Sequence, residues 1–481
     1  MLKSYNQQND VTQPPTTKIT RTDYDIIIIG GGITGLATAA ALLHREQFPS
    51  SRLLILEQAR KLHPIGATLG LFPNGLTALQ SIGGMTLAQT VMDGGVAYRG
   101  VRSCQWNSEE QEWKTRDENR SGVGGGAGGG RYQQAHVLAW YLLQQALMET
   151  ISDNSSYHPN NKDAFSNVVK FGMQFESFHQ DPDTGILTLS VRDRNRNEKC
   201  DSVDSNADLW NVTCRVLIGA DGIQSNVRDL VLQQQQQQQH QQGATKQESP
   251  YKFHNRVMYR AILGRDEFDS NIIFPPQGYT ISYRCGRPGK VFAFRENSKH
   301  VYSFTSTVLV TNEFEATSPH LTSTKKSRLK HYFQDYPRPV QHVIESVRES
   351  AIYENLIHDL NLPTYWSKGS AVLIGDAAHA MTPALGQGGN IGLEDATELA
   401  HTLGRLFRRR GKIRNNFQKE KHPCFNQKEI EEALENFWRH RIERTTMVHA
   451  LSRKCSEERN QGNPNPKIDR ETIYNWKPSF M

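Results

Sequence analysis

A glycine-rich turn follows the most apolar stretch of this chain, and it constrains the fold more than any other feature. Residues 25–29 contain four successive isoleucines and predict a strand that is buried on both faces. The turn at residues 30–35 comes next, and residues 33–45, rich in Ala and Leu, predict a helix. A second apolar strand is expected at residues 52–56. This order is a βαβ unit with parallel strands, so the sequence predicts an α/β fold.

The spacing of the glycines in this turn indicates a nucleotide-binding site. Gly30 permits the tight turn, Gly32 lets the backbone approach a pyrophosphate, and Gly35 lets the helix pack closely on the strand. The helix begins with Ile33 and Thr34. Its free N–H groups and partial positive charge would face the phosphates.

An acidic residue ends the second strand at the position where a ribose-binding carboxylate is expected. Glu57 lies 22 residues beyond Gly35, near the spacing of about 20 residues that dinucleotide-binding units show. This unit alone does not choose between FAD and NAD. The chain has no second strand–GxGxxG–helix unit, which a flavoenzyme with a separate NADPH domain would need.

Two further glycine-rich segments follow apolar strands much later in the chain. Residues 216–218 lead into Gly219-Ala220-Asp221-Gly222, where Asp221 is expected to hold the turn through backbone N–H groups. Residues 371–374 lead into Gly375-Asp376, and residues 383–390 then precede a helix expected at 391–399. The start of that helix would again offer N–H groups and the positive end of a dipole.

In this order, the three segments resemble the FAD-dependent monooxygenases related to p-hydroxybenzoate hydroxylase, over about residues 24–444. The resemblance implies a Rossmann-like FAD-binding domain of the glutathione-reductase type, a second, mainly antiparallel β-sheet domain for the substrate, and a C-terminal helix. It also implies that Asp376 binds the sugar chain on the flavin side. The helix after Asn390 would lie by the flavin pyrimidine ring, where its dipole stabilises the negative charge of the reduced flavin.

A weaker match concerns Arg131, which the resemblance places at the start of a helix near FAD. The family often has Leu at the third and seventh positions after this Arg, whereas this chain has Gln134 and Leu138. We expect the helix at residues 134–148. His379, in the Asp-Ala-Ala-His run, is expected to pack and to hydrogen-bond rather than to act as a base. The cofactor-binding candidates are Gly30, Gly32, Ile33, Thr34, Gly35, Glu57, Arg131, Asp221, Gly375, Asp376, Gly386, Gly388, Gly389 and Asn390.

The activity that the resemblance implies is hydroxylation or epoxidation of a small organic substrate, aromatic or isoprenoid. NADPH or NADH would reduce FAD as a transient co-substrate, and O2 would add to give a C4a-hydroperoxyflavin. The cofactor supplies this chemistry, so no catalytic side chain is assigned. An FAD-dependent reductase, oxidase or halogenase of the same fold and a non-catalytic flavin-binding interaction protein remain as alternatives.

The rest of the chain divides by composition. Residues 251–310 alternate in polarity and predict an antiparallel sheet, whose Tyr259, Arg260, Phe292, Phe294 and Tyr302 either line the substrate pocket or form the core. Two domains are expected: an FAD-binding domain at 24–92, 131–232 and 364–410, and a substrate domain at 93–130 and 251–363. The other expected parts are a disordered tail at 1–23, a glutamine-rich disordered insertion at 233–250, a basic insertion at 411–428 and a helix at 429–460.

Composition excludes several other classes of protein. The net charge of +6, from 56 basic and 50 acidic residues, is too small an excess to indicate nucleic-acid binding. The six cysteines form no CxxC pair and no metal-binding cluster, so no metal is expected. Residues 1–23 lack the apolar core of a secretory signal, and no apolar run approaches the ~20 residues that span a bilayer. We expect an intracellular soluble enzyme with no integral membrane segment and no obligate protein partner.

Overall fold

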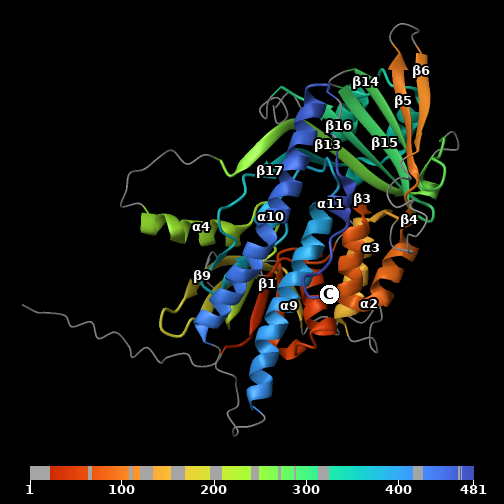
Figure 1. Cartoon of the computed structure of the whole chain (residues 1–481). Coiled ribbons are helices and arrows are strands. Elements are labelled where there is room, and N and C mark those ends of the chain that lie inside the picture. Colours follow the sequence, from red (N-terminus) through yellow and green to blue (C-terminus); the bar gives the residue numbers. More distant parts are fainter. Residues whose placement is uncertain are drawn as a thin grey trace, which may run out of the picture.

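The computed structural model describes a mixed α/β protein with several sheets (Figure 1). The described residues are 22–62, 68–107, 112–119, 134–152, 168–195, 209–239, 249–268, 272–286, 289–311, 324–414, 426–463, 466 and 468–481.

A six-stranded sheet carries the glycine-rich turns. Its order is β18 (Ser367–Lys368), β19 (Ala371–Leu373), β12 (Val216–Gly219), β1 (Ile26–Ile29), β2 (Leu53–Glu57) and β8 (Val169–Phe171). Strand β1 pairs in parallel with both β12 and β2, and its four isoleucines are buried. The expected βαβ unit is therefore confirmed, because only a central parallel strand buries both faces in this way.

Helices and a small antiparallel sheet enclose this mainly parallel sheet, in which only β18 pairs antiparallel. Helix α1 (Ile33–Ala40) packs on α9 (Gly388–Arg414) and α3 (Trp140–Ile151), and α2 (Pro73–Gly94) packs on α3 and α9. In Figure 1, β1 lies between α9 and β9. The small sheet consists of β9 (Met173–Gln180), β10 (Leu187–Asp193) and β11 (Leu209–Cys214).

Two elements differ from the sequence-based expectation. Residues 136–139 form strand β7 (His136–Ala139), which pairs with β3 (Thr68–Leu71) and β4 (Val96–Ala97), so the helix begins only at Trp140. Strand pairing thus overrides a helical periodicity that starts six residues before the helix itself. Helix α4 (Asn226–Gln239) includes the first seven glutamines of the tract, where disorder was expected, because Gln is a good helix former.

A seven-stranded sheet forms the second part. Its order is β17 (Tyr353–Leu360), β13 (Tyr251–Gly264), β16 (Val301–Leu309), β15 (Gly289–Ser298), β14 (Tyr279–Gly286), β5 (Gly100–Asn107) and β6 (Glu112–Asn119). All neighbours are antiparallel except β14 and β5.

The two faces of this sheet have different roles. One face shares a hydrophobic core with α6 (Lys325–Tyr332) and α7 (Arg338–Ser346), and the residues that it buries there include four of the aromatic candidates, Tyr259, Phe292, Phe294 and Tyr302. Arg260 belongs to the other face, because successive side chains in a strand alternate.

The C-terminal region connects the two parts. Helix α10 (Gln427–Asn460) packs on α9, β18 and β13, and it runs along much of the molecule (Figure 1). The expected C-terminal helix is confirmed, but a short helix, α11 (Arg470–Tyr474), follows it and was not predicted. None of the helices in the described ranges is long and apolar enough to cross a membrane.

Candidate active site

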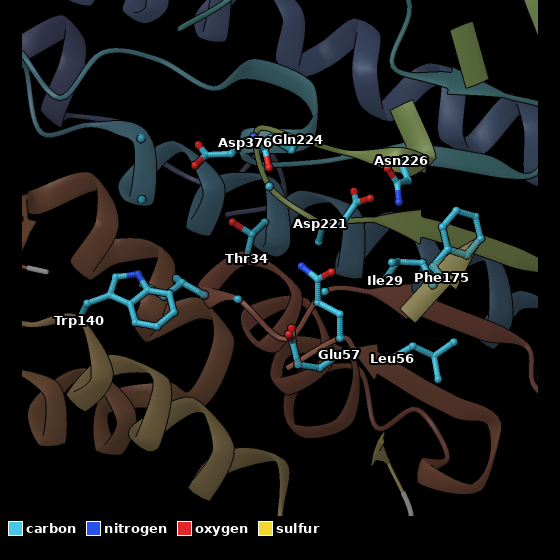
Figure 2. Close-up of a pocket in the computed structure, with 18 of the residues that line it drawn as sticks. Ile29, Thr34, Leu56, Glu57, Trp140, Phe175, Asp221, Gln224, Asn226 and Asp376 are labelled. Atoms are coloured by element: carbon cyan, nitrogen blue, oxygen red, sulfur yellow. The ribbon is translucent and has the colours of Figure 1, made fainter. Parts of the chain in front are cut away.

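A cavity of about 370 Å³ lies where the strands β1, β2 and β12 end. All three glycine-rich segments contribute to its wall. The lining residues are Ile29, Gly30, Gly32, Ile33, Thr34, Leu56, Glu57, Gln58, Leu69, Trp140, Met173, Phe175, Ala220, Asp221, Gly222, Gln224, Asn226, Asp376, Gly388 and Gly389. In the view of Figure 2, Thr34 lies between the carboxylates of Asp376 and Glu57. The carboxyl ends of parallel strands are the usual place for a nucleotide in an α/β fold.

Close backbone packing holds the three segments together. Gly30 has φ +107°, and a Cβ atom there would lie 2.4 Å from the carbonyl oxygen of Ala220. Gly375 has φ +58°, and a Cβ atom there would lie 2.6 Å from Oγ1 of Thr34. Both positions require glycine, because a side chain would be strained and would also collide. The first segment therefore touches the second through Gly30 and the third through Thr34.

The N-terminus of α1 opens onto the cavity, and no side chain of its own first turn caps it. The N-cap residue Gly32 makes no side-chain hydrogen bond, and the first turn of α1 has no acidic residue. A Cβ atom at Gly32 would meet nothing within 4 Å, whereas one at Gly35 would lie 2.1 Å from Gly30 O. Gly32 therefore leaves room for a ligand, and Gly35 permits the close packing of helix and strand. An open helix N-terminus of this kind favours a phosphate.

Glu57 is fixed by the backbone at one side of the cavity. Its Oε2 accepts a hydrogen bond from the N–H of Gly31 at 2.6 Å, and its Oε1 accepts one from the N–H of Ala59 at 2.7 Å. A carboxylate oxygen can accept more than one hydrogen bond, so both oxygens retain capacity for ligand hydroxyls.

Asp221 and Asp376 contribute the other carboxylates of the cavity wall. Asp221 accepts hydrogen bonds from Oγ of Ser225 at 2.5 Å and from the N–H of Val227 at 3.2 Å, which confirms that it holds its turn. Ser225 in turn accepts from the N–H of Arg228 at 2.9 Å. Desolvation by the surrounding protein raises the pKa of both Asp221 and Asp376. Both carboxylates are thus placed where a ligand donor would stabilise their charge.

A buried network of charged residues hydrogen-bonds to the backbone of the Gly375 turn. Asp395 accepts hydrogen bonds from the N–H of Gly375 at 3.0 Å, from Nε of Arg441 at 2.9 Å, and shares one with Nε2 of His379 at 2.5 Å. Burial opposes ionisation of Asp395, but His379 and Arg441 outweigh it and hold its pKa below the usual value. His379 therefore packs and hydrogen-bonds, as the sequence predicted.

Asn390 lies behind the cavity wall rather than in it. Its Nδ2 donates to the carbonyl oxygens of Gly70 and Gly386, each at 2.9 Å, and its Oδ1 accepts from the N–H of Phe72 at 3.0 Å. The side chain is fully buried. It therefore fixes the start of α9 against the end of β3 and against Phe72, which follows it.

A second cavity of about 550 Å³ shares β3 and the 383–389 segment with the first. The rings of Phe72 and Tyr474 are stacked in its wall, with centroids 5.0 Å apart and planes 5° apart. The lining residues are Thr68, Gly70, Phe72, Tyr98, Ala135, His136, Val137, Met258, Arg260, Arg295, Thr305, Pro383, Ala384, Leu385, Gly386, Arg459, Pro466, Ile468 and Tyr474. A concave, largely apolar site with a few polar groups is typical of a small-molecule pocket.

The structure distributes the predicted site residues among four places. The first cavity is lined by Gly30, Gly32, Ile33, Thr34, Glu57, Asp221, Asp376, Gly388 and Gly389. Gly386 lines the second cavity, and Gly35, Gly375 and Asn390 support the walls. Arg131 lies outside the described residues.

Several lining residues were missed by sequence reasoning. In the first cavity they include Gln58, Trp140, Met173, Phe175, Gln224 and Asn226. Tyr474 was missed in the second cavity. Gln224 and Asn226 belong to the second glycine-rich segment, residues 219–228, but were not singled out there. No motif marks the others, because an aromatic or amide residue at the end of an element has the same sequence signature whether it binds a ligand or packs in a core.

Comparison with known proteins agrees with this geometry. The family model described as "FAD binding domain" matches residues 23–429. The chain is 26% identical over 391 residues to salicylate hydroxylase of Pseudomonas putida. This alignment covers 78% of this chain and 76% of that protein. It is 24% identical to 3-amino-4-hydroxybenzoate 2-monooxygenase of Streptomyces cremeus, covering 91% of this chain and 88% of that protein.

Solved structures share the fold. CtdE in complex with FAD and a substrate superposes with a TM-score of 0.67 at 14% identity, over 94% of this chain and 95% of that one. Klebsiella pneumoniae HpxO in complex with FAD and uric acid gives a TM-score of 0.60 at 19% identity, over 94% of this chain and 91% of that one. The family match spans most of the chain and joins the glycine-rich segments into one FAD-binding unit, so the chain belongs to the FAD-dependent monooxygenases related to p-hydroxybenzoate hydroxylase.

Proposed function

We propose that the first cavity holds FAD in an extended form, with the adenosine ribose at Glu57 and the sugar chain on the flavin side at Asp376. The observation that carries this proposal is the position of an open helix N-terminus, at Gly32, in the same cavity as these two carboxylates. In FAD the phosphates lie between two groups that carry hydroxyls. The cavity wall offers a positive helix N-terminus for the phosphates and two carboxylates that can bind the hydroxyls.

The start of α9 would lie next to the flavin ring system. Gly388 and Gly389 line the first cavity at the N-terminus of this long helix, and Gly386 lines the second. The helix dipole places a partial positive charge there, which stabilises negative charge without a Lys or Arg side chain. Asn390 keeps this helix start in place through its hydrogen bonds to Gly70 of β3 and to Phe72.

We propose that the second cavity binds a small organic substrate, which the enzyme hydroxylates or epoxidises. When bound, FAD supplies the redox chemistry, accepting electrons from NADH or NADPH and activating O2. The chain's residues would place the substrate, with the stacked rings of Phe72 and Tyr474 forming an apolar part of the wall. His136 is the one titratable imidazole among the described lining residues of this cavity, and burial lowers its pKa.

The division of the chain follows from the same proposal. Residues 24–92, 131–232 and 364–410 would form the FAD-binding domain, for which the parallel sheet and the β9–β11 sheet support a glutathione-reductase-type fold. Residues 93–130 and 251–363 would form the substrate domain, supported by the seven-stranded sheet that combines β5 and β6 with β13–β17.

The direct test is anaerobic reduction of the purified protein's flavin by NADPH and by NADH, with and without a panel of aromatic and isoprenoid compounds. We expect a bound flavin whose bleaching is accelerated by one class of compound, and a product heavier by one oxygen atom after aerobic turnover. A protein that cannot be reconstituted with FAD would contradict the assignment of the first cavity. A flavin that neither nucleotide reduces would contradict the use of NAD(P)H.

A further inference from the structure

The C-terminal end of the chain forms one wall of the second cavity. Pro466, Ile468 and Tyr474 line that cavity, although the family model matches only residues 23–429. Most of the other lining residues, from Thr68 to Gly386, lie within the matched part. We call residue 466 and residues 468–481, which include α11, the C-terminal strap. The strap thus adds a wall that does not belong to the matched FAD-binding unit.

A buried ion pair anchors the strap at the end of α11. Arg444 of α10 bonds to both carboxylate oxygens of Glu394, each at 2.7 Å, and Glu394 is fully buried. The same guanidinium group donates to the carbonyl oxygens of Thr472 at 3.0 Å and of Ile473 at 2.7 Å. A basic side chain satisfies the last carbonyl groups of a helix in this way. Because its anchor is itself fixed, α11 has a defined position.

The residues after α11 are anchored as well. The side chain of Trp476 is buried and belongs to the core around the parallel sheet. Ser479 donates from its N–H and from its Oγ to the two carboxylate oxygens of Glu398, at 2.8 and 2.6 Å. The ring of Phe480 packs on the ring of His401, with centroids 4.0 Å apart. The strap is therefore a packed element of the fold.

Tyr474 connects the strap to the place where the two cavities meet. Its ring stacks on the ring of Phe72, with centroids 5.0 Å apart and planes 5° apart. The edge of the Phe72 ring lies against the backbone, because a Cβ atom at Gly70 or at Gly386 would be 3.2 Å from its Cε2. In Figure 1, α11 lies next to β3. Tyr474 thus covers one face of a ring that is confined by two backbone segments.

The strap leaves little freedom at its side of the second cavity. Ile468 and Tyr474 are half-buried and both line the cavity, so a ligand that fills the cavity contacts them. A ligand that exceeds the space would have to displace an element held by Arg444, Glu398 and Trp476. Packed protein resists such displacement, and overlap with it is destabilising.

We propose that the C-terminal strap sets the upper size limit of the substrate, and that Tyr474 is a specificity-determining residue of the second cavity. Tyr474 acts by contact with the substrate and by keeping the Phe72 ring in place, and it takes no part in the redox chemistry. Discrimination by the shape of an apolar pocket is a known source of substrate specificity. This proposal rests on the proposed function, because it takes the second cavity as the substrate site.

The test compares compounds of graded bulk on the FAD-loaded protein. Phenol, 2-naphthol and 4-phenylphenol carry the same hydroxyl group on apolar bodies of increasing size, and the change in flavin absorbance measures their binding. In Tyr474→Ala, we expect the affinity for 4-phenylphenol relative to phenol to rise by roughly 10-fold, because the vacated space buries the second ring. Ile468→Ala, at another lining position of the strap, should shift this ratio in the same direction.

Two further variants serve as controls. Tyr474→Phe retains the stacked ring and should keep the size preference of the unmodified protein. Tyr365→Ala also removes a tyrosine ring and should keep it too, because Tyr365 is 46% exposed, packs on Trp438 and lines neither cavity. A ratio that stays within about 2-fold of the unmodified protein's in both Tyr474→Ala and Ile468→Ala would overturn the proposal. The absence of binding of every compound to all of these proteins would overturn it as well.

A second measurement needs no ligand and separates a wall residue from a structural one. Ile473 is 1% exposed, whereas the neighbouring Tyr474 is half-buried and borders an existing cavity. Ile473→Ala should lower the melting temperature because it leaves a new void in packed protein, and Tyr474→Ala should lower it less. Equal losses in the two variants, together with an unchanged size preference, would show that Tyr474 only supports the fold.

Flavin content and flavin reduction by NAD(P)H without substrate distinguish this proposal from the proposed function. Neither readout depends on the size of the second cavity, so both should be retained in Tyr474→Ala and Ile468→Ala. An unmodified protein that binds no FAD would contradict the proposed function, and this inference with it. A flavoenzyme that NAD(P)H reduces, but whose variants accept no larger compounds, would overturn only the inference about the strap.

Discussion

The side-chain amide of Asn390 holds the backbone of Gly70, to which its Nδ2 donates a hydrogen bond at 2.9 Å. These two residues are 320 positions apart in the chain. The same amide bonds to Phe72 and Gly386, so one buried side chain fixes the point where the two cavities meet. This relationship gives the first of five predictions.

Asn390→Ala should lower the free energy of unfolding by about 3 kcal/mol, because it leaves the buried N–H of Phe72 and the two carbonyl groups without partners. Urea unfolding of the variant measures this loss. Asn463→Ala is the control, since Asn463 makes its side-chain hydrogen bonds at the surface. A loss below about 1 kcal/mol at Asn390 would show that water replaces the amide.

Glu57→Ala should weaken FAD binding by about 10- to 100-fold, because hydrogen bonds to a charged acceptor contribute roughly 1.5–3 kcal/mol each. The measurement is a fluorescence titration of the apoprotein with FAD. Glu57→Gln retains one acceptor oxygen and should have the smaller effect. Glu435→Ala, on the exposed pair with Arg439, serves as the control, and unchanged FAD affinity in Glu57→Ala would move the ribose contact to another residue.

Asp376→Asn should stabilise the apoprotein and weaken its binding of FAD. Desolvation by the surrounding protein raises the pKa of Asp376 although the residue is exposed to the cavity, so its ionised form disfavours folding by a small amount at pH 7 and not at a pH below about 3.8, where the group is neutral in both states. We therefore expect the variant's apoprotein to melt at a higher temperature at pH 7, with the difference shrinking as the pH falls. Its flavin occupancy after purification should drop. A variant apoprotein that melts lower at pH 7 would show that the carboxylate has a structural partner.

Tyr474→Ala should raise the KM for the substrate without loss of flavin. The stacked Phe72–Tyr474 pair lies in the wall of the second cavity only, and such pairs contribute about 0.5–1.5 kcal/mol beyond their buried area. This predicts a change of roughly 2- to 10-fold. Tyr474→Phe keeps the stack and should behave like the unmodified protein. Loss of flavin from Tyr474→Ala would mean that the C-terminal segment supports the first cavity.

His449 should make the protein acid-sensitive. Burial lowers the pKa of His449 to about 4, although Asp359 lies 3.9 Å from its Nε2. The unfolded chain takes up a proton near pH 6.5 that the folded protein takes up only near pH 4, so stability is present above pH 6.5 and is lost as the pH falls towards 4.

This group alone accounts for a loss of about 3 kcal/mol between pH 7 and pH 4, as an upper bound. Urea unfolding at pH 7 and pH 4.5 should show a smaller acid-induced loss for His449→Gln than for the unmodified protein. His331→Gln, at an exposed position on α6, should keep the full loss. Equal losses in all three proteins would assign the acid sensitivity to other groups.

The local parts of the site could be predicted from the sequence. The turn at Gly30, the carboxylate at Glu57 and the turn at Gly375 each follow directly from a strand end, and their chemistry depends on backbone angles and on neighbours close in the chain. Nine of the 20 residues that line the first cavity were therefore predicted as cofactor-binding residues. The start of α3 was predicted too early, because four residues of β7 satisfy a helical pattern as well as they satisfy strand pairing.

The sequence by itself determined the order of strands, glycine turns and helices, and with it the nucleotide-binding edge of the sheet. Only the tertiary structure decided which side of the seven-stranded sheet faces the second cavity, and so placed Arg260 there and Tyr259 in the opposite core. Alternation along a strand separates two sets of residues but does not say which set meets a helix and which meets a ligand. That choice depends on packing between segments hundreds of residues apart, as the bond from Asn390 to Gly70 shows, and no local pattern contains it.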